Sequence, residues 1–176
     1  MEERLDEAFE FDDRLTVVGS KLEPGDAAPD FTLDWIHPDT GMRETVSLSE
    51  SAGTVRLLNV VISLDTPVCQ IETRTWDEMF ADLPVDVTIY TITMDLPFAV
   101  ERWTSESGIT HKGLSAHRSE QFGRDYGVLI KEWRMFQRSI FVIDSDGRIA
   151  YTEYVANQLM EPNYQAAEEA VREVAR

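Results

Sequence analysis

The order of strand-like and helix-like segments in this sequence predicts an α/β domain built on a mixed β-sheet. Two apolar, β-rich runs at 56–62 and 139–143 are typical of strands covered on both faces. Apolar side chains recur every three or four residues over 67–83, which predicts an amphipathic helix directly after the first run. The overall order β-α-β-α-β-β-α makes the strands parallel where helices cross over and antiparallel in a late hairpin.

The chain begins with an acidic segment, residues 1–13, which we predict to be an N-terminal arm lying on the body; a frayed helix is the alternative. Residues 14–176 are expected to form one domain, because a chain of 176 residues has the length of a single domain. Within it, 30–36 and 43–48 alternate polar and apolar side chains, as half-buried strands do.

The rest of the chain continues the alternation of strands and helices. In order, we predict a β-rich run at 85–94, a helix at 97–106, a short helix at 119–126, the strand at 139–143 and a hairpin partner at 148–155. Pro162 then opens a last helix at 163–176, whose inward face is made of alanine and valine.

The charge of the chain limits its partners. It carries 33 acidic and 16 basic residues, for a formal net charge of -17. Such a field repels nucleic acids and anionic lipid surfaces. The longest apolar run is far shorter than the roughly 20 residues that cross a bilayer, and the first residues are acidic, unlike a secretory signal. We therefore predict a cytoplasmic protein without nucleic-acid or membrane partners.

The sequence contains a single cysteine, Cys69, which excludes an internal disulfide and zinc sites built on cysteine pairs. His37, His111 and His117 lie on separate segments and lack the spacing of a metal site on one helix. Neither a glycine-rich phosphate loop nor a Gly-x-Ser-x-Gly elbow is present. No metal or other cofactor is predicted.

The setting of Cys69 is that of a reactive thiol. Thr66 is a good N-cap and Pro67 suits the first helical position, so Cys69 falls in the first turn of the predicted helix. There the helix dipole favours the thiolate, which is the nucleophilic form of cysteine.

The helix terminus alone does not suffice. Making a typical thiol ionise near pH 6 requires about 3.4 kcal/mol, whereas a helix end supplies about 0.3–1 kcal/mol. Asp65 and Glu72 are close in sequence and disfavour a thiolate. An active Cys69 therefore requires a nearby arginine, and Arg138, directly before the strand at 139–143, is the candidate.

Five separated motifs carry a family resemblance, and they occur in the family's order. They are 25–31 (GDAAPDF), 63–69 (SLDTPVC), 95–99 (DLPFA), 122–128 (FGRDYGV) and 161–164 (EPNY). From Leu15 to the C-terminus the sequence resembles the thiol peroxidase branch of the peroxiredoxins, enzymes with a thioredoxin-like fold that reduce hydroperoxides through a peroxidatic cysteine.

The resemblance implies a thioredoxin-like mixed β-sheet flanked by helices, and it implies roles for three residues. Cys69 matches the peroxidatic cysteine, Thr66 the hydroxyl that orients the peroxide oxygen, and Arg138 the guanidinium that stabilises thiolate and transition state. The implied substrates are hydrogen peroxide and organic hydroperoxides, the product on Cys69 is a sulfenic acid, and the implied assembly is a homodimer packed near the active-site face.

Two positions depart from the family pattern. Ile62 stands where the family usually has a proline, seven residues before the cysteine, and Thr104 stands where it commonly has a resolving cysteine. A one-cysteine cycle is therefore predicted, in which thioredoxin, glutaredoxin or a low-molecular-weight thiol reduces the sulfenic acid. Two alternatives stay open: a redox-sensing or partner-binding protein with little turnover, and a thioredoxin-fold remnant with an inert Cys69.

Other aromatic and basic residues are secondary candidates. Large aromatic side chains usually serve packing, and among the four tryptophans Trp103 and Trp133 are the better candidates for lining a pocket. Arg118 and Arg134 either assist Arg138 or form exposed ion pairs.

Overall fold

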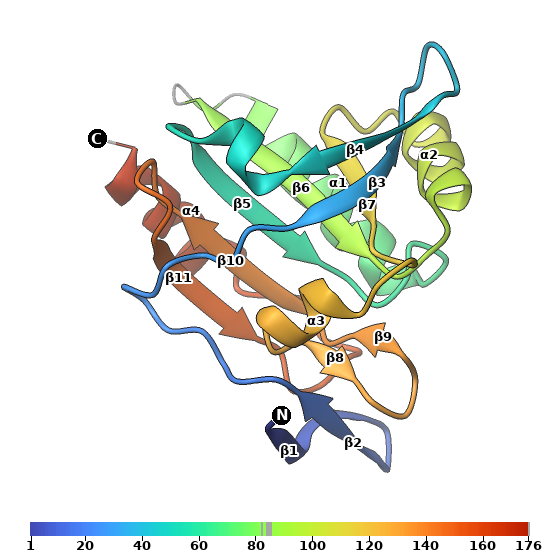
Figure 1. Cartoon of the computed structure of the whole chain (residues 1–176), viewed down its shortest axis with the longest axis vertical. Helices are drawn as coiled ribbons and strands as arrows, with labels where there is room; N and C mark the ends of the chain where they lie inside the picture. Colours follow the sequence, from blue (N-terminus) through green and yellow to red (C-terminus); the bar gives the residue numbers. More distant parts are fainter. Residues whose placement is uncertain (82, 84–85, 176) are drawn as a thin grey trace.

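The computed structural model describes residues 1–81, 83 and 86–175, which form two β-sheets with helices around the larger one (Figure 1). The larger sheet has the order β11-β10-β5-β6-β7-β3-β4. Its strands are β3 (Thr32–Ile36), β4 (Arg43–Ser47), β5 (Val55–Val60), β6 (Val87–Thr93), β7 (Lys112–Ser115), β10 (Ser139–Ile143) and β11 (Ile149–Tyr154). The smaller sheet, in the order β1-β2-β8-β9, consists of β1 (Glu3–Glu10), β2 (Asp13–Val18), β8 (Leu129–Ile130) and β9 (Met135–Phe136).

The helices follow the strands as expected for an α/β domain. They are α1 (Pro67–Ala81), α2 (Pro97–Glu106), α3 (Gln121–Asp125) and α4 (Tyr164–Val174), with a short 3-10 turn, η1 (Leu48–Ser51). Strands β5, β6 and β7 are parallel, whereas β10 is antiparallel to both β5 and β11. The predicted mixed sheet is therefore confirmed, with parallel crossovers and an antiparallel late hairpin.

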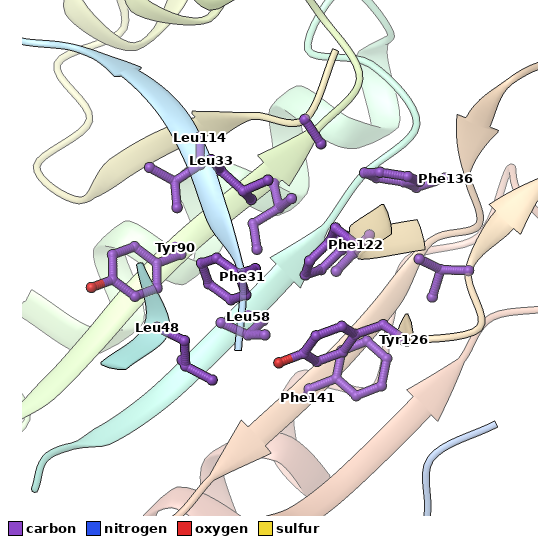
Figure 2. Close-up of a cluster of buried hydrophobic side chains, with 14 of the residues drawn as sticks. Phe31, Leu33, Leu48, Leu58, Tyr90, Leu114, Phe122, Tyr126, Phe136 and Phe141 are labelled. Atoms are coloured by element: carbon purple, nitrogen blue, oxygen red, sulfur yellow. The ribbon is translucent and has the colours of Figure 1, made fainter. Parts of the chain in front are cut away.

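The central strand β5 divides the core into two layers. Successive side chains of a strand point to opposite faces, and Leu58 packs in one hydrophobic cluster while Leu57 packs in another. Figure 2 shows the first layer, in which Phe31, Phe122 and Tyr126 lie over the sheet. The rings of Phe122 and Tyr126 stack with their centroids 4.5 Å apart.

The second layer lies under α1 and α4 and contains the fully buried Trp76 and Val171. The indole of Trp76 packs edge-on against Tyr164, at 4.8 Å between centroids. With both faces covered, every residue of β5 is buried, Arg56 and Asn59 included, which fits its largely apolar pattern. This rigid strand ends just before the loop that leads to Cys69.

The acidic N-terminal segment forms β1 and the start of β2, so the frayed helix considered for it is wrong. Strand β1 pairs with β2 in an antiparallel hairpin, which Figure 1 shows beside β8 and β9. Two backbone hydrogen bonds tie this hairpin to the body: the Phe9 amide donates to the Ala156 carbonyl (2.8 Å), and the Gln158 amide donates to the Phe9 carbonyl (2.9 Å).

Several boundaries differ from the sequence-based expectation. Helix α1 ends at Ala81 and α4 at Val174, earlier than the periodicity predicts. Residues 82, 84, 85 and 176 lie outside the described residues, and they include the expected first residue of the strand at 85–94. The strands β7, β8 and β9 were not predicted. Over the described residues, no helix combines the length and apolar character needed to span a membrane.

Candidate active site

The sulfur of Cys69 is held in the first turn of α1. The helix begins at Pro67, and the Gln70 amide donates to the Thr66 carbonyl (3.1 Å), which closes that turn. Thr66 occupies the predicted cap position, but its hydroxyl donates backward to the Ser63 carbonyl (2.7 Å) instead of receiving a helix amide. The hydroxyl therefore shapes the loop before the helix, and Cys69 itself is 0% exposed.

The loop before α1 is anchored by a carboxylate from the next strand. Asp95, just after β6, accepts a hydrogen bond from the Ser63 hydroxyl and another from the Leu64 amide, each at 2.8 Å. Two motifs that are 31 residues apart or more thus meet at one point. The contact fixes where Thr66 and Cys69 lie relative to the sheet.

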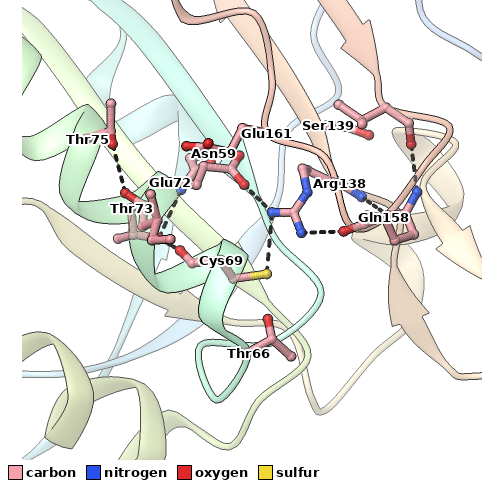
Figure 3. A network of polar contacts seen from close by, with 12 residues as sticks. Asn59, Thr66, Cys69, Glu72, Thr73, Thr75, Arg138, Ser139, Gln158 and Glu161 are labelled. Atoms are coloured by element: carbon pink, nitrogen blue, oxygen red, sulfur yellow. Dashed lines mark hydrogen bonds and ion pairs between the residues drawn. The ribbon is translucent and has the colours of Figure 1, made fainter. Parts of the chain in front are cut away.

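Arg138 reaches the cysteine from the other side of the site. It precedes β10, is 1% exposed, and its Nη1 donates to the Sγ of Cys69 at 3.5 Å (Figure 3). The same nitrogen forms an ion pair with the buried carboxylate of Glu72. Gln158 holds the rest of the residue, because its side-chain oxygen accepts the Arg138 amide and its carbonyl accepts Nη2, both at 2.8 Å.

The electrostatics of this cluster are those of one cation shared by two acids. Burial raises the pKa of Glu72, and the nearby guanidinium of Arg138 opposes that rise. Burial also tends to lower the pKa of Arg138, but the charges of Glu72 and Cys69 outweigh it and raise that pKa. Arg138 therefore stays charged in a poorly solvated site, where its field acts on the sulfur with little screening.

A mostly apolar pocket of about 430 Å³ opens beside this cluster. Thr66 and Arg138 contribute its polar groups near Cys69, and Glu10 reaches it from the N-terminal hairpin. Its apolar walls come from Ile62, Pro67, Val68, Trp133, Met135 and Leu159. An uncharged molecule with a short hydrocarbon part fits such a lining.

The structure places only some of the secondary candidate residues at the pocket. Trp133 lines the pocket, whereas Trp103 is buried in the cluster around Cys69, with the guanidinium of Arg74 lying 5.2 Å from its ring centroid. Arg118 lies 3.7 Å from Asp34, away from the pocket. Arg134 similarly pairs with Glu120 at 2.9 Å.

Sequence reasoning missed four residues of the site. Glu72 was treated only as an adverse charge, although its position three residues after Cys69 places it on the same side of the helix. Gln158, Asp95 and Glu10 are distant in sequence from the cysteine. Of these three, Asp95 alone had a signal in the sequence, because it begins the family motif at 95–99.

Comparison with known proteins places this geometry in a family. The protein-family model described as Redoxin matches residues 23–167. The chain belongs to the Redoxin family. Among curated relatives, this Redoxin-family chain is 43% identical to a thiol peroxidase from Bacillus subtilis, over 90% of this chain and 92% of the relative. It is 42% identical to a thiol peroxidase from Listeria innocua, over 90% of this chain and 93% of that one.

Solved structures agree with this family assignment. A peroxiredoxin-like protein from Aquifex aeolicus superposes with a TM-score of 0.83 at 30% identity, covering 97% of this chain and 98% of that one. A thiol peroxidase from Chromobacterium violaceum gives a TM-score of 0.80 at 26% identity, with 98% of each chain covered. The predicted thioredoxin-like fold, the thiol peroxidase branch of the peroxiredoxins and the peroxidase class of enzyme are thereby confirmed.

The two departures from the branch's usual pattern occupy different surroundings. Ile62 is buried and forms part of the pocket wall beside Thr66. Thr104 lies in α2, where its hydroxyl donates to the Glu101 carbonyl at 3.0 Å. With Cys69 as the single cysteine of the sequence, this Redoxin-family protein fits a one-cysteine mechanism.

Proposed function

We propose that this peroxiredoxin reduces hydrogen peroxide and organic hydroperoxides, with Cys69 as the nucleophile, Thr66 as the orienting hydroxyl and Arg138 as the stabilising cation. The observation that supports this most strongly is the 3.5 Å contact between the Sγ of Cys69 and Nη1 of Arg138, beside a largely apolar pocket. A sulfur and a fixed cation at that distance are the two groups that heterolysis of an O–O bond requires.

In the first half of the cycle, the thiolate of Cys69 attacks the terminal oxygen of the hydroperoxide. The S–O bond forms as the O–O bond breaks, and the leaving oxygen takes the electron pair and a proton to become water or an alcohol. Sulfur is oxidised to a sulfenic acid. Arg138 lowers the barrier because its donors already point into the site and need no reorganisation as negative charge moves between the oxygens.

Thr66 supports the same step, because it also lines the pocket. Its hydroxyl hydrogen is engaged with the Ser63 carbonyl, so its oxygen is left to act as an acceptor for the terminal O–H of the peroxide. The Nε of Arg138 is buried and has no hydrogen-bond partner among the described residues. A buried donor without a partner is costly, and a peroxide oxygen is a suitable acceptor for it.

In the second half, an external thiol reduces the sulfenic acid. Its sulfur attacks the Cys69 sulfur, water leaves, and a mixed disulfide forms, which a second thiol then resolves to restore Cys69. Thioredoxin, glutaredoxin or a low-molecular-weight thiol meets this requirement. Because such thiols are kept reduced in the cytoplasm, the proposal includes a cytoplasmic location.

The proposal also includes a homodimer that packs near the active-site face. Three large apolar side chains on α1 and at the start of α2 are well exposed: Ile71 (50%), Leu96 (58%) and Phe98 (65%). Exposed apolar side chains on neighbouring elements are a common feature of protein interfaces. Leu96 directly follows Asp95, the residue that anchors the loop before Cys69.

A redox-sensing protein with little turnover is the second candidate. It is favoured by one observation: Cys69 is 0% exposed, which restricts the access of a protein thiol to its sulfenic acid. In that case oxidation would persist and a partner would respond to it, so the two functions differ in the rate of reduction and share the oxidation step.

Rapid mixing of the reduced protein with hydrogen peroxide tests the proposal, with tryptophan fluorescence as the signal because Trp133 lines the pocket. We expect a fast single-turnover phase that Cys69→Ser abolishes. Steady-state peroxide consumption with thioredoxin, glutaredoxin or a small thiol then separates the enzyme from the sensor. Slow oxidation by every peroxide tried would overturn both.

A further inference from the structure

We infer that Glu10 is a charge-selecting residue at the pocket beside Cys69, which disfavours hydroperoxides that carry a carboxylate and favours uncharged ones. The inference rests on the proposed peroxidase function and assigns a preference within its substrates. It is carried by the place of Glu10 in the pocket and by the charges of the groups around it.

The position of Glu10 is fixed by the backbone. It is the last residue of β1, and its neighbour Phe9 exchanges hydrogen bonds with the segment that contains Ala156 and Gln158. Gln158 in turn binds Arg138 and lines the same pocket as Glu10. The hairpin therefore brings Glu10 to the lining of this pocket.

In the part of the chain that the structure describes, the carboxylate of Glu10 has no balancing cation. Among the described residues, Glu10 forms no ion pair with a lysine, an arginine or a histidine, and Arg138 is the one positively charged side chain in the pocket lining. Arg138 is already paired with Glu72 and faces Cys69. With the cysteine ionised, one positive charge therefore faces three negative ones: those of Glu72, Cys69 and Glu10.

The remaining lining does not screen that imbalance. It is mostly apolar, as described above, and a half-buried charge beside apolar walls acts over a longer distance than one in bulk water. A second carboxylate brought in by the substrate meets an unpaired negative charge and loses part of its hydration. An ester or hydrocarbon group at the same place carries neither penalty.

The test compares three peroxides with the same reacting group: cumene hydroperoxide, its para-carboxy derivative, and the methyl ester of that derivative. The readout is the second-order rate constant for oxidation of Cys69, measured by rapid mixing. For the unmodified protein we expect the ester to react about 10-fold faster than the carboxylate at low salt. Glu10→Gln should reduce this ratio at least threefold, and Glu10→Lys should reverse the preference.

Glu2→Gln is the matched control, because Glu2 is exposed, lies in the same N-terminal segment outside the pocket, and its replacement removes the same amount of charge. This variant should keep the full ester-to-carboxylate ratio. Raising the ionic strength should compress the ratio of the unmodified protein more than that of Glu10→Gln.

The inference is overturned if Glu10→Gln leaves the ratio unchanged, or if Glu2→Gln relaxes it equally, since the effect would then belong to the net charge of the chain. Failure of the proposed function gives a different result: the unmodified protein would react slowly with hydrogen peroxide and with all three organic peroxides. A protein that reacts rapidly with all of them at one common rate is a peroxidase without the selectivity inferred for Glu10.

Discussion

Helix α1 carries two carboxylates, the buried Glu72 and the half-buried Asp77, whose pKa values are shifted in opposite directions. Burial raises the pKa of Glu72, near the start of the helix, and the guanidinium of Arg138 compensates only in part. Burial also tends to raise the pKa of Asp77, about one and a half turns later, but hydrogen bonds from His111 and Thr110 outweigh it and lower that pKa to about 2. Two positions on one helix, five residues apart, therefore provide different electrostatic environments.

The two pKa shifts differ because the two carboxylates accept different numbers of hydrogen bonds. Asp77 Oδ1 accepts the Thr110 amide and hydroxyl and the His111 Nδ1, each at 2.9 Å, and the imidazole is held further by Thr91 (2.8 Å to Nε2). Glu72 has one partner, Arg138, which it shares with Cys69, and its Oε1 has none among the described residues.

This contrast separates a structural pair from a reactive one. Asp77 and His111 line a cavity of about 530 Å³, yet Thr91, the hydroxyl that contacts the imidazole, is fully buried and unavailable as a nucleophile. The cluster around Glu72 is less completely hydrogen-bonded and contains the sulfur. Incomplete satisfaction of buried polar groups is typical of functional sites.

Removing the shared cation should have the largest effect. We expect Arg138→Ala to lower the rate of peroxide oxidation about 100- to 1000-fold and to destabilise the fold by about 3–5 kcal/mol, because Glu72 is left buried without a partner. Rapid mixing and urea unfolding measure the two effects. Arg138→Lys, which keeps the charge but loses the planar fork, should fall between the two proteins.

Arg134→Ala is the control for that experiment. Arg134 lies four residues away and pairs with Glu120 at the surface, so its loss should change stability by less than about 0.5 kcal/mol. If Arg138→Ala reacts with peroxide as fast as this control, Arg138 is not the stabilising cation.

Farther along the helix, Asp77→Asn should cost about 1 kcal/mol of stability at pH 7, a value reduced because this carboxylate is close to solvent. The pKa of Asp77 in the folded protein, about 2, lies below the unfolded value. Its stabilisation is therefore present above about pH 4 and is lost as the pH falls toward 2. Urea unfolding across this range should show the two proteins converging at low pH.

The exposed Glu78, on the same helix, provides the control variant Glu78→Gln. This variant should retain the unmodified protein's dependence on pH between 4 and 2. A constant difference between Asp77→Asn and the unmodified protein over that range would mean that the hydrogen-bonded charge is not the source of stability.

The smallest effect on the chemistry of Cys69 is expected from Glu72→Gln. Replacing the carboxylate with an amide of the same shape removes a like charge that competes with the Cys69 thiolate for Arg138. The midpoint of the pH profile for peroxide oxidation should therefore move to lower pH, by about half a unit. A midpoint that moves upward would show that Glu72 acts chiefly by orienting the guanidinium.

The sequence predicts those parts of the fold that have a strong local pattern. The strand at 139–143 and the helix at 97–106 are found with those bounds, since a continuous apolar run and a proline at the helix start are clear signals. Strand β7 was missed because Lys112–Ser115 contains one large apolar side chain, and its pairing is decided by its neighbours β6 and β3. Tertiary context overrides local preference there.

For the candidate site, the sequence leads to Cys69, Thr66 and Arg138, which the structure places around or beside one pocket. Their roles stay predictions. The backward hydrogen bond of Thr66 was not foreseen, because a threonine before a helix has several backbone acceptors within reach. The contributions of Gln158 and Glu10 depend on long-range folding of the hairpin against the loop at 156–158, which no local pattern encodes.

The tie between the first strand and this loop has a practical consequence. The backbone of Phe9 is hydrogen-bonded to the segment that contains Gln158. Gln158 in turn accepts hydrogen bonds from the backbone amide and the side chain of Arg138. Strand β1 thus supports the guanidinium of Arg138 indirectly, through the short segment at 156–158. A chain that begins at β2 should therefore react more slowly with peroxide, because Arg138 loses part of its support.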